Sequence, residues 1–194
     1  MADVLSRTLV AFFVAVAALS VAPSAHAAVE DWQRGANMRA NYDTHFSSAE
    51  AQESMRRLKA TGANYISFVL ELESPWFTSS SVNRVGATPT DESLRAAINF
   101  AHSLGLAVNL KPHVEAPGVS WRAYINPGDR TAWFASYREH VLRFARIAEE
   151  SGAEMFTVGT ELISLASGDE HPDNTGHWRA LIAAVREVYG GSLT

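Results

Sequence analysis

The stretch that decides the fold is residues 129–162, DRTAWFASYREHVLRFARIAEESGAEMFTVGTEL. Asp129 is a typical helix cap, and apolar side chains then recur on one stripe at helical spacing: Phe134, Tyr137, Val141, Phe144 and Ala148. Gly152 ends this helix. Residues 155–158 predict a short strand, and the chain leaves that strand through Gly159-Thr160-Glu161. The stretch is therefore a helix, a glycine, a strand and a polar strand end.

An equivalent unit lies upstream. Ser47 begins a helix, with Glu50 three residues later in a capping-box pattern, and Gly62 ends it. Residues 65–70 are rich in β-branched and aromatic side chains and predict the strand that follows. A short opening strand is expected before this helix, over residues 35–38. The order of elements is the same as in the first stretch.

Two further units complete the chain. Thr90 caps a helix that stops at Gly105, and a strand is expected over residues 106–110. The last helix ends at Gly190-Gly191, and residues 192–194 look like the start of another strand. One helix and one strand therefore recur about every forty residues, which predicts βαβ units and a parallel sheet.

The connections distinguish a barrel from a doubly wound sheet. No Gly-x-Gly-x-x-Gly pattern follows a strand, which disfavours a dinucleotide-binding sheet. The links from strand to helix are long, over residues 71–89, 112–128 and 162–174, and barrel enzymes build their sites from such loops. We therefore expect residues 28–194 to form part of a (β/α)8 TIM barrel. The first four to five strand-helix units are present, since eight such units need a longer chain.

The N-terminus is predicted to be a cleaved signal peptide. Arg7 forms a small basic region, and residues 9–19 are almost wholly apolar. This run is shorter than the roughly 20 residues that span a bilayer. Ala25-His26-Ala27 is the small-x-small pattern that precedes a signal-peptidase site. We expect residues 1–27 to be removed and the mature chain, 28–194, to be secreted or periplasmic, with no other membrane contact.

Composition excludes several functions. The formal net charge of −5 argues against nucleic acid as a partner, because nucleic acid favours a basic surface. The chain has no cysteine, so its stability depends on a buried core and not on disulfides. His113 and Glu115 are metal-ligand types, but no clear third ligand accompanies them, and no metal is expected. No cofactor is implied, and the oligomeric state is left open.

The predicted strand ends carry the candidate chemistry. Glu161 follows the fourth strand, and Gly159 leaves room for a ligand near the backbone, which suits acid/base catalysis on a substrate above the strands. Lys111 and His113 end the preceding strand and project to the same side. They could bind sugar hydroxyls or hold Glu161 in place. A polar strand end that meets only water is one alternative, and a Schiff-base role for Lys111, as in barrel aldolases, is another.

Aromatic and polar side chains gather in the loops after the strands. The apolar face of a sugar ring packs on an aromatic ring, so these side chains suit a carbohydrate. The candidates for substrate binding are Asn37, Tyr42, Trp76, Trp121 and Tyr124, with His45 and Phe77 beside them. Any one of them could instead pack its loop onto the barrel. Trp133 and Trp178 fall on helices and are interpreted as packing residues.

Two motifs resemble glycoside hydrolase family 113. The first is LKPHVE at residues 110–115, followed by Trp121, Ile125 and residues 133–137; the second is MFTVGTEL at residues 155–162. The likeness extends from about Gly35 to the end of the chain. That family contains β-mannanases of the large clan of retaining (β/α)8 glycosidases. The resemblance implies a glycosidase acting on a β-linked polysaccharide or oligosaccharide, with β-mannan favoured.

The resemblance also implies roles for individual residues. Glu161 matches the general acid/base of a double-displacement reaction. Thr160, counted here as substrate-binding, stands where the wider clan usually has an asparagine that binds the sugar 2-hydroxyl. The nucleophilic glutamate is implied at the end of strand seven, beyond Thr194, so residues 1–194 alone are expected to be inactive. The alternatives are a non-catalytic carbohydrate-binding barrel and a lyase or aldolase that uses Lys111.

Overall fold

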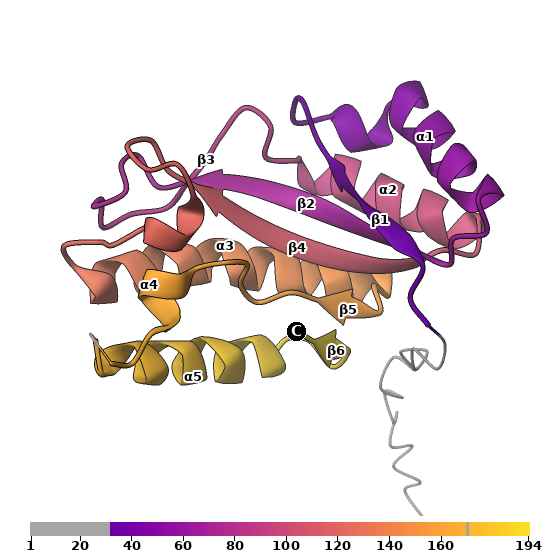
Figure 1. Ribbon diagram of the computed structural model, residues 1–194. Coiled ribbons are helices and arrows are strands. Elements are labelled where there is room, and N and C mark those ends of the chain that lie inside the picture. The colour runs from indigo at the N-terminus through magenta and orange to yellow at the C-terminus, as the bar shows by residue number, and fades with distance from the viewer. Residues whose placement is uncertain (1–31, 170) are drawn as a thin grey trace, which may run out of the picture.

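The computed structural model describes residues 32–169 and 171–194 (Figure 1), so the predicted signal peptide lies outside the described residues. The strands are β1 (Gly35–Arg39), β2 (Tyr65–Glu73), β3 (Asn83–Arg84), β4 (Ala107–Glu115), β5 (Met155–Phe156) and β6 (Ser192–Leu193). The helices are α1 (Ala49–Ala60), α2 (Asp91–Ser103), α3 (Arg130–Ser151), α4 (Ile163–Ala166) and α5 (Asp173–Arg186), with 3-10 turns η1 (His45–Ser47) and η2 (Arg122–Tyr124).

The sheet has the strand order β1-β2-β4-β5-β6, and every neighbouring pair in that order is parallel. Each strand is therefore joined by a helix to the strand beside it. This is the order of a (β/α)8 barrel wall, whereas a doubly wound sheet reverses its order at a switch point. β3 differs, because it pairs antiparallel with the end of β2. The predicted parallel sheet is confirmed.

The two faces of the sheet differ in polarity. Along β2 and β4, side chains such as Phe68 and Leu110 are buried and belong to the hydrophobic core. The alternate side chains, among them Glu71 and Lys111, point to the other face and are only half-buried. Figure 1 shows α2 and α3 behind β2 and β4, so the apolar face is the one that the helices cover. We call the opposite, polar face the inner face.

The helix signals read from the sequence are largely confirmed. The Thr90 hydroxyl accepts the amide hydrogen of Ser93 at the start of α2, and the Asp129 carboxylate accepts that of Ala132 at the start of α3. All five residues of the stripe predicted for the third helix are buried. Gly152 follows α3 in the left-handed conformation, with φ 72°. Local capping and periodicity thus placed α2 and α3 correctly.

Several predicted boundaries were wrong, among them those of β2, which extends past residue 70 to Glu73, and of β5, which ends at Phe156 and not at residue 158. The cap of α1 is Ser48, whose hydroxyl accepts an amide hydrogen of the first turn, whereas Ser47 belongs to η1. The strand expected to end at His113 continues to Glu115, because its ladder with β2 continues that far. α5 ends before the predicted stop at Gly190. For β4, the pairing with the neighbouring strand moved the boundary by two residues.

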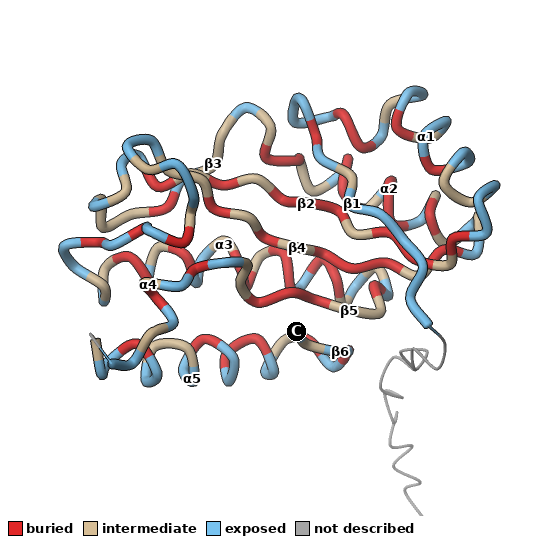
Figure 2. The backbone as a smooth tube through the Cα atoms, in the orientation of Figure 1, coloured by how far each residue is buried: buried red, intermediate tan, exposed pale blue. Residues whose placement is uncertain are grey.

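The loops that follow the parallel strands gather at one end of the sheet (Figure 1). They contain β3, η2 and α4, which the sequence did not predict. Figure 2 shows the buried residues concentrated along the central strands and the exposed residues at the loops and the outer sides of the helices. Of the helices in the described ranges, none combines the length and the apolar character that a membrane span requires.

Candidate active site

Glu161 lies in the segment that joins β5 to α4. Its backbone has φ 56°, and no other non-glycine residue in the described ranges has a positive φ. An L side chain is strained in this left-handed conformation, and such strain persists where the surroundings hold it, frequently at functional sites. The Glu161 side chain is 49% exposed, so its carboxylate faces open space.

The loop after β4 holds the Glu161 carboxylate. The Trp121 indole nitrogen donates a hydrogen bond to Oε2 at 2.8 Å. Arg122 Nη1 donates to the same oxygen. No hydrogen bond within the described residues reaches Oε1. The two carboxylate oxygens therefore have different environments.

Arg122 connects Glu161 with β4. Its Nη2 donates to Glu115 Oε1 while its Nη1 donates to Glu161, so one guanidinium spans two carboxylates. The Arg122 side chain is only 15% exposed. Sequence reasoning missed Arg122 and considered Glu115 only as a metal ligand. Lys111 and His113 are two residues apart on a strand, and the same alternation would have placed Glu115 on their face. No spacing in the sequence indicated Arg122.

The contacts of Glu161 also determine its protonation. The Trp121 hydrogen bond has the largest effect and lowers the pKa of the carboxyl; partial desolvation opposes it, and Arg122 lowers the pKa further by a hydrogen bond and its charge. His113 contributes in the same direction at the acid pH where its ring is protonated. In this arrangement Glu161 is ionised at neutral pH, which is the state of a base.

His113 lies on the inner face of β4, between Lys111 and Glu115. Burial lowers the pKa of its imidazole, and the Arg122 cation lowers that pKa further, so the ring is neutral at pH 7. Its Nδ1 is buried and has no hydrogen-bond partner within the described residues; Glu115 Oε1 stands 3.9 Å away. A ligand hydroxyl at this position would satisfy the ring nitrogen.

Charged side chains continue across the inner face. In the β2–β4 ladder, Glu71 stands opposite His113 and Glu73 opposite Glu115. Arg39, at the end of β1, forms an ion pair with Glu71. In the part of the chain that the structure describes, no three His, Asp or Glu side chains are grouped to hold a metal ion. The inner face thus offers hydrogen-bonding groups of both charges to a polar ligand.

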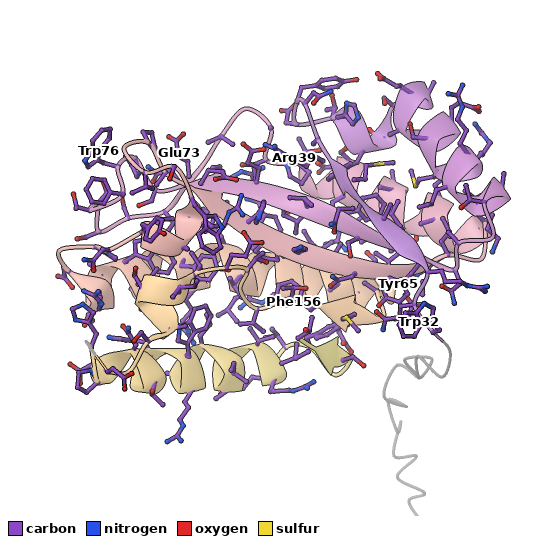
Figure 3. All side chains as sticks on the ribbon, in the orientation of Figure 1. Trp32, Arg39, Tyr65, Glu73, Trp76 and Phe156 are labelled. Atoms are coloured by element: carbon purple, nitrogen blue, oxygen red, sulfur yellow. The ribbon has the colours of Figure 1, made fainter. Side chains whose placement is uncertain are left out.

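One predicted aromatic residue, Trp121, stands next to Glu161, and a second, Tyr124, packs on Trp121. Trp121 contacts its carboxylate, and the Tyr124 ring meets the Trp121 ring edge to face with 5.9 Å between centroids. Trp76 lies on the loop after β2, and Figure 3 places it where the central strands finish. Its ring packs over Gly118, since a Cβ on that glycine would stand 2.5 Å from the indole. All three aromatic side chains are exposed.

Other predicted residues lie outside this group. The Tyr42 ring packs edge to face on His45, in the segment between β1 and α1. Asn37 on β1 stands in register with Ser67 on β2, two residues before Arg39. Asn37 and Ser67 line a shallow pocket. Thr160 follows β5, with its hydroxyl 3.5 Å from the Pro112 carbonyl oxygen. No hydrogen bond or ring contact among the described residues joins these three side chains to Glu161.

Gly159 has a different role from the one predicted. A Cβ at this position would lie 2.5 Å from the Trp178 ring, so packing from α5 fills the space that was expected to admit a ligand. The Trp178 indole donates to the Leu165 carbonyl in α4. Trp133 is fully buried in α3. The interpretation of Trp133 and Trp178 as packing residues is confirmed.

The strained backbone at Glu161 predicts an unusual order of stability. Glu161→Gly and Glu161→Ala both remove the carboxylate and its contacts, but only alanine keeps a Cβ at φ 56°. Glycine lacks the left-handed strain, although its greater freedom when unfolded offsets part of this gain. We expect the glycine variant of the full-length protein to melt roughly 1–3 °C above the alanine variant in calorimetry. An alanine variant of equal or higher melting temperature would mean that the backbone relaxes at no cost.

Comparison with known proteins places the chain among glycosidases. The sequence profile "Glycoside Hydrolase Family 113" matches residues 38–194. A solved family 113 β-1,4-mannanase shares 32% identity with a TM-score of 0.74, and the match covers 83% of this chain and 53% of that one. A complex of a family 113 β-1,4-mannanase gives 32% identity and a TM-score of 0.72, covering 81% and 52%.

A third solved structure is the family 113 β-mannanase AaManA from Alicyclobacillus acidocaldarius in complex with ManMIm. It shares 27% identity with a TM-score of 0.73, over 83% of this chain and 52% of that one. The chain thus spans about half the length of these solved chains. A comparison with curated protein sequences finds no match. Together with the strand order, these similarities confirm the predicted partial (β/α)8 barrel.

Proposed function

The chain belongs to glycoside hydrolase family 113, and from this premise we propose that it forms the acid/base side of a retaining glycosidase that hydrolyses β-1,4-mannan. Glu161 is the proposed acid/base. His113, Lys111, Trp121 and Tyr124 are the proposed sugar contacts nearest to it. The substrate assignment is supported by the similar solved β-mannanases, of which this chain covers about half.

The setting of Glu161 carries this proposal. Its carboxylate is exposed beyond β5, held on one side by Trp121 and Arg122, on a backbone that is strained for any side chain. Strained backbone conformations of this kind cluster at functional sites, which supports a functional role for this carboxylate. The neutral, unsatisfied His113 ring and the exposed aromatic faces nearby suit a neutral, hydroxyl-rich ligand.

The proposed reaction has two steps. In the first, Glu161 in its acid form donates a proton to the glycosidic oxygen, while a second carboxylate attacks the anomeric carbon and the leaving sugar departs. In the second, ionised Glu161 accepts a proton from water, which attacks the anomeric carbon and releases the nucleophilic carboxylate. The nucleophilic carboxylate is proposed to lie outside residues 1–194.

The second carboxylate would also correct the protonation of Glu161. Trp121 and Arg122 favour the ionised form that the second step needs. A carboxylate about 5–5.5 Å away would oppose them, because two like charges at that distance disfavour double ionisation. It would therefore raise the pKa of Glu161 toward the value of a proton donor, as the first step requires.

Hydrolysis by the full-length protein tests the proposal. We expect it to release reducing ends from β-1,4-mannan faster than from cellulose or xylan, and to retain the anomeric configuration of the first product by proton NMR. Binding of mannan without hydrolysis would favour the non-catalytic carbohydrate-binding alternative. The remaining alternative is activity on a carbonyl substrate. If borohydride added together with that substrate then inactivates the protein and modifies Lys111, a Schiff-base lyase or aldolase is favoured.

The contact between Trp76 and Gly118 can be tested with a matched pair of glycine variants. Gly118 and Gly62 have nearly equal positive φ, 86° and 85°, but only Gly118 has a ring against it. Both alanine substitutions strain the backbone, and only Gly118→Ala must also displace Trp76. We expect Gly118→Ala to weaken the binding of mannan oligosaccharides in calorimetry, and Gly62→Ala to leave it unchanged. Equal affinities in both variants, or a further loss from Gly118→Ala in a Trp76→Ala background, would show that Trp76 is not the mediator.

We further propose that residues 1–27 direct export and are removed, which leaves a secreted or periplasmic mature protein. The apolar run at residues 9–19 and the Ala25-His26-Ala27 pattern support this proposal. N-terminal sequencing of the exported protein is expected to begin at Ala28. Retention of the intact N-terminus in the cell would contradict it.

A further inference from the structure

The two oxygens of the Glu161 carboxylate are not equivalent. Trp121 Nε1 and Arg122 Nη1 both donate to Oε2, and no hydrogen bond within the described residues reaches Oε1. Indole and guanidinium N–H groups donate only and cannot accept. A proton on Oε2 would therefore face two donor hydrogens, whereas a proton on Oε1 meets no such conflict.

Arg122 is itself anchored from a second direction. Glu115, the last residue of β4, accepts from Nη2 while Glu161 accepts from Nη1. The guanidinium is planar and rigid, so a fixed Nη2 also fixes the direction of Nη1. Because the side chain is largely buried, the surrounding protein restricts its other rotamers. The strand thus determines where the Glu161 carboxylate can lie.

We propose that Arg122 is a positioning residue for Glu161: anchored by Glu115, it holds Oε2 together with Trp121 and reserves Oε1 as the oxygen that gives and takes the proton. This inference rests on the proposed function, in which Glu161 exchanges a proton with the glycosidic oxygen and with water. It adds which oxygen reacts and which residue keeps that oxygen pointed at the substrate.

Arg122 and His113 are the titratable or charged groups that act on the pKa of Glu161. Arg122, from the loop after β4, and His113, from the inner face of β4, both lower the pKa of Glu161. Lys111 and Glu115 lie on the same inner face of β4. On the other side, the pocket shared with α4 and α5 is lined by uncharged side chains such as Leu162 and Trp178. Arg122 is the cation that contacts the carboxylate directly, so its removal should dominate any change.

The test compares Arg122→Leu with Arg143→Leu in the full-length protein. Arg143 also pairs with a carboxylate, that of Asp91, but on the helical side of the fold. In carbon-13 NMR of labelled glutamate, with the Glu161 signal assigned by its loss in Glu161→Gln, Arg122→Leu should move the Glu161 titration to higher pH. Arg143→Leu should leave it in place. This measurement needs no catalytic activity.

The kinetics of mannan hydrolysis provide a second test of the role of Arg122. A misdirected acid slows turnover more than binding, so Arg122→Leu should lower kcat about 10- to 100-fold with a small change in KM. The alkaline limb of the kcat/KM profile should move to higher pH, because the acid without its cation stays protonated longer. Arg122→Lys should recover only part of kcat, since an ammonium cannot span both carboxylates as the fork does.

Three outcomes would decide against the inference or separate it from its premise. A folded Arg122→Leu protein with an unmoved Glu161 titration and alkaline limb would make Arg122 a support for the loop alone and overturn the proposal. If Arg122→Leu does not fold, Glu115→Leu is measured instead, because leucine cannot accept from Arg122 Nη2, and an unchanged kcat in that variant would overturn the proposal equally. If the unsubstituted protein does not hydrolyse mannan, the proposed function fails, while the NMR titration still decides whether Arg122 controls Glu161.

Discussion

Glu161→Gln in the full-length protein is expected to reduce the turnover of β-1,4-mannan by about 100- to 10,000-fold. Glutamine has nearly the same shape and its amide oxygen can still accept from Trp121, so the site should stay intact. It cannot donate a proton to the glycosidic oxygen or take one from water, and both steps of the proposed reaction lose their acid/base. Initial rates of reducing-end release measure the effect.

The matched control for this substitution is Glu53→Gln. Glu53 also pairs with an arginine, Arg57, but on the exposed side of α1. Its replacement should leave turnover within twofold of the parent value. In an aryl mannoside with an acidic phenol, the phenolate leaves without being protonated. Glu161→Gln should therefore slow the first step on such a substrate much less than the first step on mannan. An equal loss on both substrates would contradict a proton-donating role, and so would an active Glu161→Gln protein.

Trp133→Ala is expected to lower the free energy of unfolding by about 3–5 kcal/mol. Trp133 is fully buried in α3, with its ring against those of Phe134 and Tyr137 at 5.3 and 5.0 Å between centroids. Alanine leaves a cavity where three aromatic rings now meet. Since total stability of a domain is about 5–15 kcal/mol, this change alone could prevent folding at growth temperature. Urea unfolding of the full-length protein measures it.

Trp121→Ala and Trp133→Phe separate packing from function in this comparison. Trp121 is exposed, so its removal should affect mannan turnover but barely change the urea midpoint. Trp133 Nε1 has no hydrogen-bond partner within the described residues, so phenylalanine loses no polar contact and should cost less stability than alanine. A loss from Trp133→Ala below about 1 kcal/mol would show that the neighbouring rings collapse into the space.

The helices and the strand order were predictable because their signals are local. Capping by Thr90 and Asp129, the apolar stripe of α3 and the stop at Gly152 each depend on residues within a few positions of one another. Repetition of that unit indicated a parallel sheet, and the long strand-to-helix links indicated that the site lies at the loop end. The misassigned cap at Ser47 shows the limit, because Ser47 and Ser48 offer the same local signal.

Part of the candidate site followed from the same reasoning. Glu161, Lys111 and His113 were recognised as polar residues at the ends of adjacent strands, and the resemblance to family 113 gave Glu161 its expected role. Arg122 and the filled space beside Gly159 were not recognised. Both depend on contacts between side chains that are far apart in the sequence, and the spacing of residues along the chain does not predict such contacts.

By itself the amino-acid sequence determined the repeating strand-helix unit, the parallel order of the sheet and a carboxylate at the end of β5. These follow from hydrophobic periodicity, glycine stops and capping, which act between near neighbours. Only the tertiary structure decided that Trp121 and Arg122, 40 and 39 residues before Glu161, hold one oxygen of its carboxylate. The reason is physical: a contact between loops depends on the path of each loop over the folded sheet, and that path exists only once the core has formed.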